Sequence, residues 1–206
     1  MSESIKYIKE PGSGEYVDRK SRFIAEMCFC ETEESAEEFI KAEKKKYYDA
    51  KHHCFAYIIG NAKEIKRYSD DGEPQRTAGM PIMDVINGSG LTNICIVVTR
   101  YFGGTLLGPG GLVRAYQGAA KLALENAVIG EQKDSLIVTF VTNYKASNAV
   151  LNYCQTNSVE ILETVYLEEV TFKCLIFPEN EEKFITDITN LTLGSVNIVD
   201  KERRFV

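Results

Sequence analysis

The stretch Ile94-Cys95-Ile96-Val97-Val98-Thr99-Arg100-Tyr101-Phe102-Gly103-Gly104-Thr105-Leu106-Leu107-Gly108-Pro109-Gly110-Gly111 joins an apolar run to a glycine-rich segment. The apolar run predicts a β-strand. Residues 112–127 then repeat apolar side chains, many of them alanine, at helical spacing, with polar residues on the opposite side. Five glycines within nine residues allow positive φ angles and close backbone approach. We therefore expect a strand, a tight glycine loop and a helix packed closely on a sheet.

The same stretch has the ingredients of an anion site. The first N–H groups of a helix are unpaired and carry partial positive charge, which favours phosphate groups. Two arginines flank the loop, and a second basic segment precedes an earlier predicted strand. The candidate anion- or nucleic-acid-binding residues are Lys20, Arg22, Arg100, Gly103, Gly104, Gly108, Gly110, Gly111 and Arg114. Neither the Walker pattern nor the dinucleotide-binding pattern is present, so the alternative is that the glycines only shape a turn.

The two histidines of the chain are neighbours, His52 and His53, within a predicted strand at residues 52–59. Successive strand residues point to opposite faces, so these two cannot chelate one metal in regular geometry. We expect one to face inward and one outward. Imidazole titrates near neutral pH, so a histidine that lies at a binding site could act as an acid or a base. A structural role is the alternative.

Three carboxylates, Asp70, Asp71 and Glu73, surround Gly72 in a polar segment at residues 67–79. They could hold a hard cation such as Mg²⁺. Asp-Gly and Glu-Pro are also ordinary turn formers, and no calcium-loop pattern is present. A solvated turn is therefore the favoured interpretation, and we expect no metal and no cofactor.

Composition limits the classes of function. The chain has 206 residues and a net charge of −6, which disfavours a generally basic nucleic-acid binder but permits a local basic patch. Residues 1–131 carry 17 basic and 19 acidic side chains, whereas residues 132–206 carry 7 and 11. No apolar stretch approaches the roughly 20 residues of a membrane span, and the N-terminus does not read as a signal peptide. Six cysteines without C-x-x-C spacing predict free thiols in a cytoplasmic protein with no membrane partner.

Periodicity predicts the remaining elements. Before the glycine loop we expect strands at 21–30 and 52–59, a helix at 33–48 capped by Thr32, and a short helix at 81–87 stopped by Gly88. After a polar linker at 130–134, we expect strands at 136–141, 159–166, 168–177 and 195–199, with helices at 145–157 and 179–191. This βαββαβ order is that of a ferredoxin-like sandwich. The predicted domains are residues 1–131 and residues 135–206.

Several motifs resemble those of the IMPACT/YigZ family. They are Lys20-Ser21-Arg22-Phe23, the strand from His52 to Tyr57, Tyr68 to Pro74, Gly79-Met80-Pro81, and the long run from Val98 to Tyr116. The resemblance covers residues 15–130, and the C-terminal part matches the bacterial YigZ branch in placement and element order.

The resemblance implies an α+β protein of two domains. The N-terminal one would be an α/β sandwich like the second domain of a small-subunit ribosomal protein, and the C-terminal one a ferredoxin-like sandwich as in elongation factor G. The resemblance also implies a link to translational control during amino-acid starvation, in which the eukaryotic family member acts by binding an activator of a kinase. That member has an additional partner-binding domain that we do not expect in this sequence, so its partner is not carried over, and the resemblance supplies no catalytic residues.

Two functional hypotheses remain. The first is a cytoplasmic, non-enzymatic binding protein that contacts RNA, DNA or a ribosome-associated partner and is linked to translational regulation. The second is a hydrolase or transferase acting on a phosphorylated small molecule, using a histidine and the carboxylates beside the glycine loop. A deep pocket where these groups converge would favour the enzyme, and a broad basic groove would favour the binding protein. The sequence identifies no small-molecule ligand.

Overall fold

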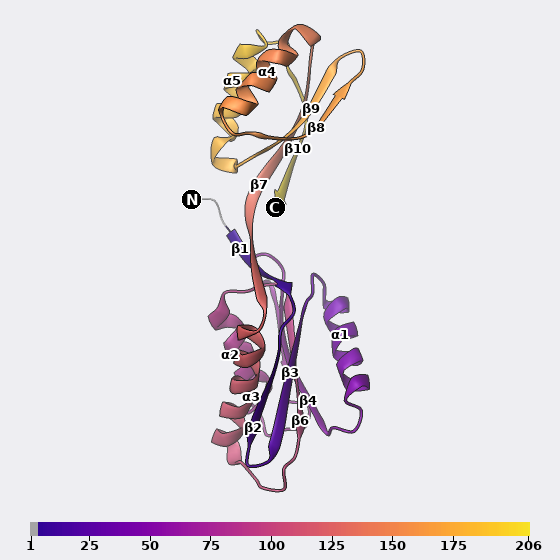
Figure 1. Cartoon of the computed structure of the whole chain (residues 1–206), viewed down its shortest axis with the longest axis vertical. Helices are drawn as coiled ribbons and strands as arrows, with labels where there is room; N and C mark the ends of the chain where they lie inside the picture. Colours follow the sequence, from indigo (N-terminus) through magenta and orange to yellow (C-terminus); the bar gives the residue numbers. More distant parts are fainter. Residues whose placement is uncertain (1–3) are drawn as a thin grey trace. The chain divides into compact units, whose positions relative to one another are not determined.

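The computed structural model describes residues 4–206, which form two compact units, Ile5–Glu131 and Gln132–Val206 (Figure 1). The α+β fold class predicted from the sequence is confirmed. The elements before the second unit are β1 (Ser4–Glu10), β2 (Ser13–Asp18), β3 (Ser21–Phe29), α1 (Glu33–Lys46), β4 (His52–Ile59), β5 (Ile65–Ser69), α2 (Gly79–Ser89), β6 (Ile94–Tyr101) and α3 (Gly108–Glu125). Five of these strands form an antiparallel sheet in the order β2-β3-β6-β4-β5.

Strand β6 lies at the centre of this sheet and is buried on both faces. Ile94, Ile96 and Val98 belong to the core that the sheet forms with α2 and α3, while Cys95 and Val97 belong to a separate core with α1. Figure 1 shows α1 on one side of the sheet and α2 and α3 on the other. Since both faces are covered, the strand needs a continuous apolar run and not an alternating one.

Local signals explain where the helices begin and end. Thr32 caps α1, with its side chain accepting from the backbone N–H of Ser35 and the Ser35 side chain accepting from Thr32, as predicted for the cap. Helix α2 ends at Gly90 in the left-handed conformation, so the predicted stop at Gly88 was wrong. Helix α3 begins at Gly108 and not at Leu112, because Pro109 favours the first helical turn.

The alanine-rich face of α3 packs against β2 and the sheet, as its composition predicted. Ala119, Ala120 and Ala123 are fully buried. A Cβ atom added to Gly14 of β2 would lie 2.6 Å from the backbone nitrogen of Ala123. The small side chains therefore let helix and strand approach until their backbones are nearly in contact.

The second unit has the predicted βαββαβ order. Its elements are β7 (Val128–Thr142), α4 (Tyr144–Thr156), β8 (Glu160–Tyr166), β9 (Val170–Ile176), a 3₁₀ turn (Pro178–Asn180), α5 (Glu181–Leu191) and β10 (Asn197–Phe205). Strands β8, β9, β7 and β10 pair antiparallel in that order, and β1 is also hydrogen-bonded to β7 in the same sheet. In Figure 1, α4 and α5 lie on one face of this sheet, and the core between them contains Phe140, Phe172 and Phe184. Asn143 caps α4 by accepting from the backbone N–H of Ala146, as expected.

The predicted linker and the predicted end of the last strand were wrong. Residues 130–134 are not a loop but part of the 15-residue strand β7. Lys133 exchanges backbone hydrogen bonds of 2.9 and 3.0 Å with Val206, and buried Asp134 pairs with Phe205 of β10 and accepts from Arg203. Strand pairing at this end of the segment therefore overrides its local polarity. Strand β10 accordingly runs to Phe205 and not to 199. The start of the polar 67–79 segment is also a strand, since β5 pairs with β4.

Other expectations agree with the structure. All six cysteines are free thiols, and five of them are buried. Across residues 4–206, none of the helices is both long and apolar enough to cross a membrane.

The close contact between α3 and β2 predicts opposite outcomes for two glycine-to-alanine substitutions. Gly14→Ala should lower the free energy of unfolding by about 1–3 kcal/mol, because the added methyl group overlaps the α3 backbone. Gly88→Ala, in α2, should raise it by about 0.5–1 kcal/mol, because nothing lies within 4 Å of the new Cβ atom and alanine favours the helix. Urea unfolding followed by circular dichroism measures both, and a neutral Gly14→Ala would contradict the close packing.

Candidate functional site

A cavity of about 480 Å³ opens where β6 ends and β4 begins, within the N-terminal unit. We call it the Arg100 pocket. Its walls are formed by Asp49, Ala50, Lys51, His52, Arg100, Tyr101, Phe102 and Leu106. The first four residues come from the α1–β4 connection and the start of β4, and the others come from the end of β6 and the loop 102–107 that leads into α3.

Arg100 is only 7% exposed, and its charge is compensated within the protein. Its Nη1 atom donates a 2.7 Å hydrogen bond to Oε1 of Glu73, whose side chain is also buried. The Tyr116 hydroxyl, from α3, donates to the same oxygen at 2.8 Å. A carboxylate in this environment needs such partners, because an unpaired buried charge is very costly. Glu73 therefore links the polar loop, the central strand and α3.

Tyr116 extends this network into the core. The Cys54 thiol lies 3.3 Å from the tyrosine hydroxyl oxygen and 3.0 Å from the carbonyl oxygen of Asp70. Burial, together with Cys54 and Glu73, raises the pKa of Tyr116 far above its usual value. The hydroxyl therefore keeps its proton at physiological pH and remains a hydrogen-bond donor to Glu73.

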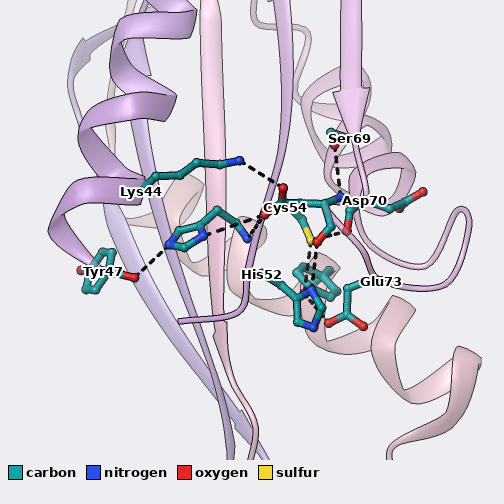
Figure 2. A network of polar contacts seen from close by, with 10 residues as sticks. Lys44, Tyr47, His52, Cys54, Ser69, Asp70 and Glu73 are labelled. Carbon is teal, nitrogen blue, oxygen red and sulfur yellow. Dashed lines mark hydrogen bonds and ion pairs between the residues drawn. The ribbon is translucent and has the colours of Figure 1, made fainter. Parts of the chain in front are cut away.

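The three carboxylates of the polar loop have different partners, and Figure 2 labels two of them, Asp70 and Glu73. Asp70 accepts from the backbone N–H groups of Arg76, Ala78 and Gly79, and so caps the start of α2. Asp71 accepts from Lys44 at 3.1 Å and from the backbone N–H of His53 at 2.7 Å. The segment is a turn, as predicted, but protein groups engage its carboxylates and Glu73 is buried, so the predicted exposure of these carboxylates to solvent was wrong. Within residues 4–206, no cluster of three or more histidine, cysteine or carboxylate side chains is arranged to hold a metal ion.

The two histidines face opposite sides of the sheet, as predicted. His53 is buried, and its Nε2 atom lies 3.0 Å from the carbonyl oxygen of Tyr47 in α1's C-terminal cap. His52 is half-buried in the wall of the Arg100 pocket, directly opposite Arg100 in the β4–β6 register. Its Nδ1 atom lies 2.9 Å from the carbonyl oxygen of Asp71, and because a carbonyl oxygen can only accept, that nitrogen carries a proton.

The predicted basic residues differ in their surroundings. Arg22 forms a two-point ion pair with Glu15, at 2.8 and 3.1 Å, which neutralises it. Lys20 is exposed in the turn before β3, and its backbone lies against Gly103. Arg114 is exposed on α3 and reaches back toward Gly110. Of the predicted arginines, Arg100 is the one that lines the cavity.

The predicted glycines have identifiable structural roles. A Cβ atom on Gly103 would lie 2.0 Å from the carbonyl carbon of Lys20, and its N–H donates to the Ser21 side chain at 3.0 Å. Gly104 and Gly108 adopt φ angles of 88° and 70°, which other residues rarely adopt. Gly110 and Gly111 lie in the first turn of α3. These roles account for the glycine pattern without a ligand, and binding of an anion by these residues stays a prediction.

Sequence reasoning missed several residues of the site. Tyr116 was read only as an apolar helix position, and its hydroxyl becomes relevant once α3 lies over Glu73. Asp49 and Lys51 belong to no sequence motif that would have indicated them. The carboxylate of Asp49 accepts from the Tyr101 hydroxyl at 2.7 Å, which raises the pKa of that tyrosine to about 12. The exposed Phe102 was visible in the sequence as an aromatic residue beside a glycine loop.

Comparison with known proteins identifies the family. The Impact N-terminal domain family model matches residues 19–124, and a domain family of unknown function, DUF1949, matches residues 142–195. The chain belongs to the IMPACT family. It is 36% identical to IMPACT family member YvyE of Bacillus subtilis, covering all of this chain and 95% of that protein. It is 31% identical to IMPACT family member YigZ of Escherichia coli, covering 88% of this chain and 90% of that protein.

A solved structure described as a hypothetical protein shares the fold of nearly the whole chain. It superposes with a TM-score of 0.66 at 29% sequence identity, covering 97% of this chain and 98% of the other. The family resemblance and the two-domain fold class are therefore both supported by findings independent of the motifs.

The buried ion pair predicts strongly non-additive effects of substitution. Arg100→Met alone should cost about 3–5 kcal/mol of folding free energy, because it leaves Glu73 charged and buried. The double variant Arg100→Met with Glu73→Gln should cost less than Arg100→Met alone, because no charge remains and the glutamine still accepts from Tyr116. Urea unfolding of the two single variants and the double variant tests this. Additive losses would show that the two side chains do not depend on each other.

Asp71 predicts a loss of stability that depends on pH. Burial alone would raise the pKa of this carboxyl, but the hydrogen bond from the His53 backbone and the ion pair with Lys44 together lower it. A lowered pKa stabilises the fold above the unfolded-state value and stops doing so as pH falls through the folded-state value. Asp71→Asn should therefore cost about 1–2 kcal/mol at pH 7, and the difference from wild type should close below about pH 4. Thermal unfolding across pH measures it, and a constant difference would contradict the assignment.

Proposed function

We propose that this protein is a non-enzymatic RNA-binding protein of the cytoplasm, linked to translational regulation, and that RNA binds around the 102–107 loop of the N-terminal unit. The observation that carries the proposal is the presence of exposed basic side chains and an exposed aromatic ring around one loop. Exposed cations attract phosphate groups, and unpaired bases stack on exposed aromatic rings.

The cations come from three parts of the N-terminal unit. Lys20 lies against Gly103, Lys51 lines the Arg100 pocket together with Phe102, and Arg114 lies in α3 just after the loop. All three are exposed, and none has a carboxylate partner among residues 4–206. They are therefore available to a polyanion even though the whole chain is acidic.

Aromatic side chains favour single-stranded RNA over a duplex. Phe102 is 56% exposed and Leu106 is 81% exposed, and both lie on the loop. Base stacking on an exposed ring contributes about 1–3 kcal/mol per base and requires an unpaired base. Membership of the IMPACT family supports a connection with translational regulation, and RNA engaged in translation is a partner of the right chemistry.

A phosphotransfer or hydrolase enzyme is the second candidate, and one observation favours it. His52 and Arg100 are directly paired in the sheet register and both line a cavity of about 480 Å³. A histidine beside a guanidinium is a common arrangement for chemistry on phosphates. The carboxylates argue against it, since Glu73 is occupied by Arg100 and Tyr116 and Asp70 caps α2.

The proposal predicts a steep and localised salt dependence. The full-length chain should bind a fluorescent single-stranded RNA, and the affinity should fall with rising salt because neutralised phosphates release counterions. A triple variant, Lys20→Gln, Lys51→Gln and Arg114→Gln, should reduce the salt slope by about two units. The matched control changes three exposed cations of the second unit, Lys145, Lys183 and Arg204, to glutamine and alters the net charge equally.

Fluorescence anisotropy across a salt series separates the outcomes. Weaker RNA binding by the first triple variant, with little change in the control variant, supports binding at the 102–107 loop. An equal loss of RNA affinity in both variants would show that binding depends on the overall charge of the protein and not on this site. Absence of RNA binding at low salt would reject the proposal in favour of the enzyme.

A further inference from the structure

The Arg100 pocket contains a buried donor that the protein itself leaves unused. The Nε atom of Arg100 is inaccessible to solvent and has no hydrogen-bond partner among the described residues. Buried polar groups are nearly always paired, and an unpaired one costs about 1–3 kcal/mol. Arg100 lines the pocket, so a ligand bound there would meet a guanidinium that still has unused donor capacity.

The guanidinium is held firmly while this edge remains free. Glu73 fixes its Nη1 atom, and the rings of Phe23 and Phe102 lie 5.4 and 5.6 Å from its central carbon. Glu73 is itself fixed by Tyr116. The arginine therefore loses little conformational freedom when a ligand binds, and a preorganised guanidinium binds phosphate oxygens well.

Other groups in the same cavity suit the remaining parts of a nucleotide. Lys51 adds a second positive charge, and His52 presents its Nε2 side. Asp49, with one carboxylate oxygen engaged by Tyr101, has acceptor capacity for a hydroxyl group. Phe102 offers a partly exposed ring at the rim. Cations, a hydroxyl acceptor and an aromatic surface thus surround one space.

We infer that the Arg100 pocket binds the terminal nucleotide of an RNA strand through a phosphate monoester, which is held by Arg100 and Lys51 while the base lies against Phe102. This inference rests on the proposed function and specifies which part of the RNA is recognised. A cavity of about 480 Å³ is in the ordinary range for small-molecule sites and accepts one nucleotide. A terminal phosphate is bonded to a single ribose, so it can enter a pocket that an internal phosphodiester could reach only by bending the strand sharply.

The experiment compares three oligoribonucleotides of one sequence, carrying a 5′-phosphate, a 3′-phosphate or no terminal phosphate. Full-length protein should bind one phosphorylated form at least about tenfold more tightly than the unphosphorylated form. The matching nucleoside monophosphate should compete for that advantage. Lys51→Gln and Phe102→Ala, both at exposed positions, should remove the advantage, whereas Lys20→Gln with Arg114→Gln should weaken all three RNAs alike.

Arg100 is tested by Arg100→Lys, which keeps the charge opposite Glu73 but lacks the Nε donor. It should lose the preference for a terminal phosphate while retaining general RNA binding, with the unfolding midpoint measured in parallel.

The outcomes distinguish the terminal-nucleotide site from general RNA binding. If all three RNAs bind wild type equally, the terminal-nucleotide site is rejected and general RNA binding stands. If no RNA binds but the monophosphate alone binds and is lost in Lys51→Gln and Phe102→Ala, the nucleotide site stands and the RNA partner is rejected. If neither RNA nor monophosphate binds, both are rejected.

Discussion

The ion pair between Arg100 and Glu73 is the interaction on which the arrangement of the site depends. It lies at the end of β6, a strand whose apolar residues are buried against helices on both faces. A charged side chain at this position requires a partner within the protein, because solvent cannot supply one. Glu73 meets that requirement only if the polar loop after β5 folds back over the sheet and if Tyr116 of α3 lies above it. One pairing thus positions a loop, a strand and a helix together.

The same constraint explains the fate of the neighbouring carboxylates. With Glu73 held over the sheet, Asp70 lies at the start of α2 and Asp71 lies beside the β4 backbone and Lys44. Each carboxylate is therefore engaged in a different structural contact, and together they do not form a cation site. The carbonyl oxygen of Asp71 then orients His52 toward the cavity. The Arg100 pocket consequently contains the side chains of Lys51, His52 and Arg100, together with a single carboxylate, that of Asp49.

The two units differ in their charge and in the side chains that they expose to a partner. The N-terminal unit has exposed cations and an exposed aromatic ring around one loop. The C-terminal unit carries more acidic than basic residues, and its main core is built from phenylalanines beneath two helices. Phosphate groups are attracted by the first set of features and repelled by the second. The N-terminal unit is therefore where a nucleic acid would be held.

The sequence by itself determined the fold class and most of the elements, because periodicity and helix caps are local properties, but it did not predict strands β1, β2 and β5. The apolar run at 94–98, the alanine face of α3 and the Thr32 and Asn143 caps all led to correct assignments. Only the tertiary structure decided the roles of the polar residues. Residues 130–134 became strand because segments distant in the chain pair with β7, among them β1 and, opposite Asp134, Phe205 of β10, and Glu73 became buried because Arg100 lay opposite it. Such choices depend on partners distant in the chain, and a charged side chain carries no local signal of which partner it will meet.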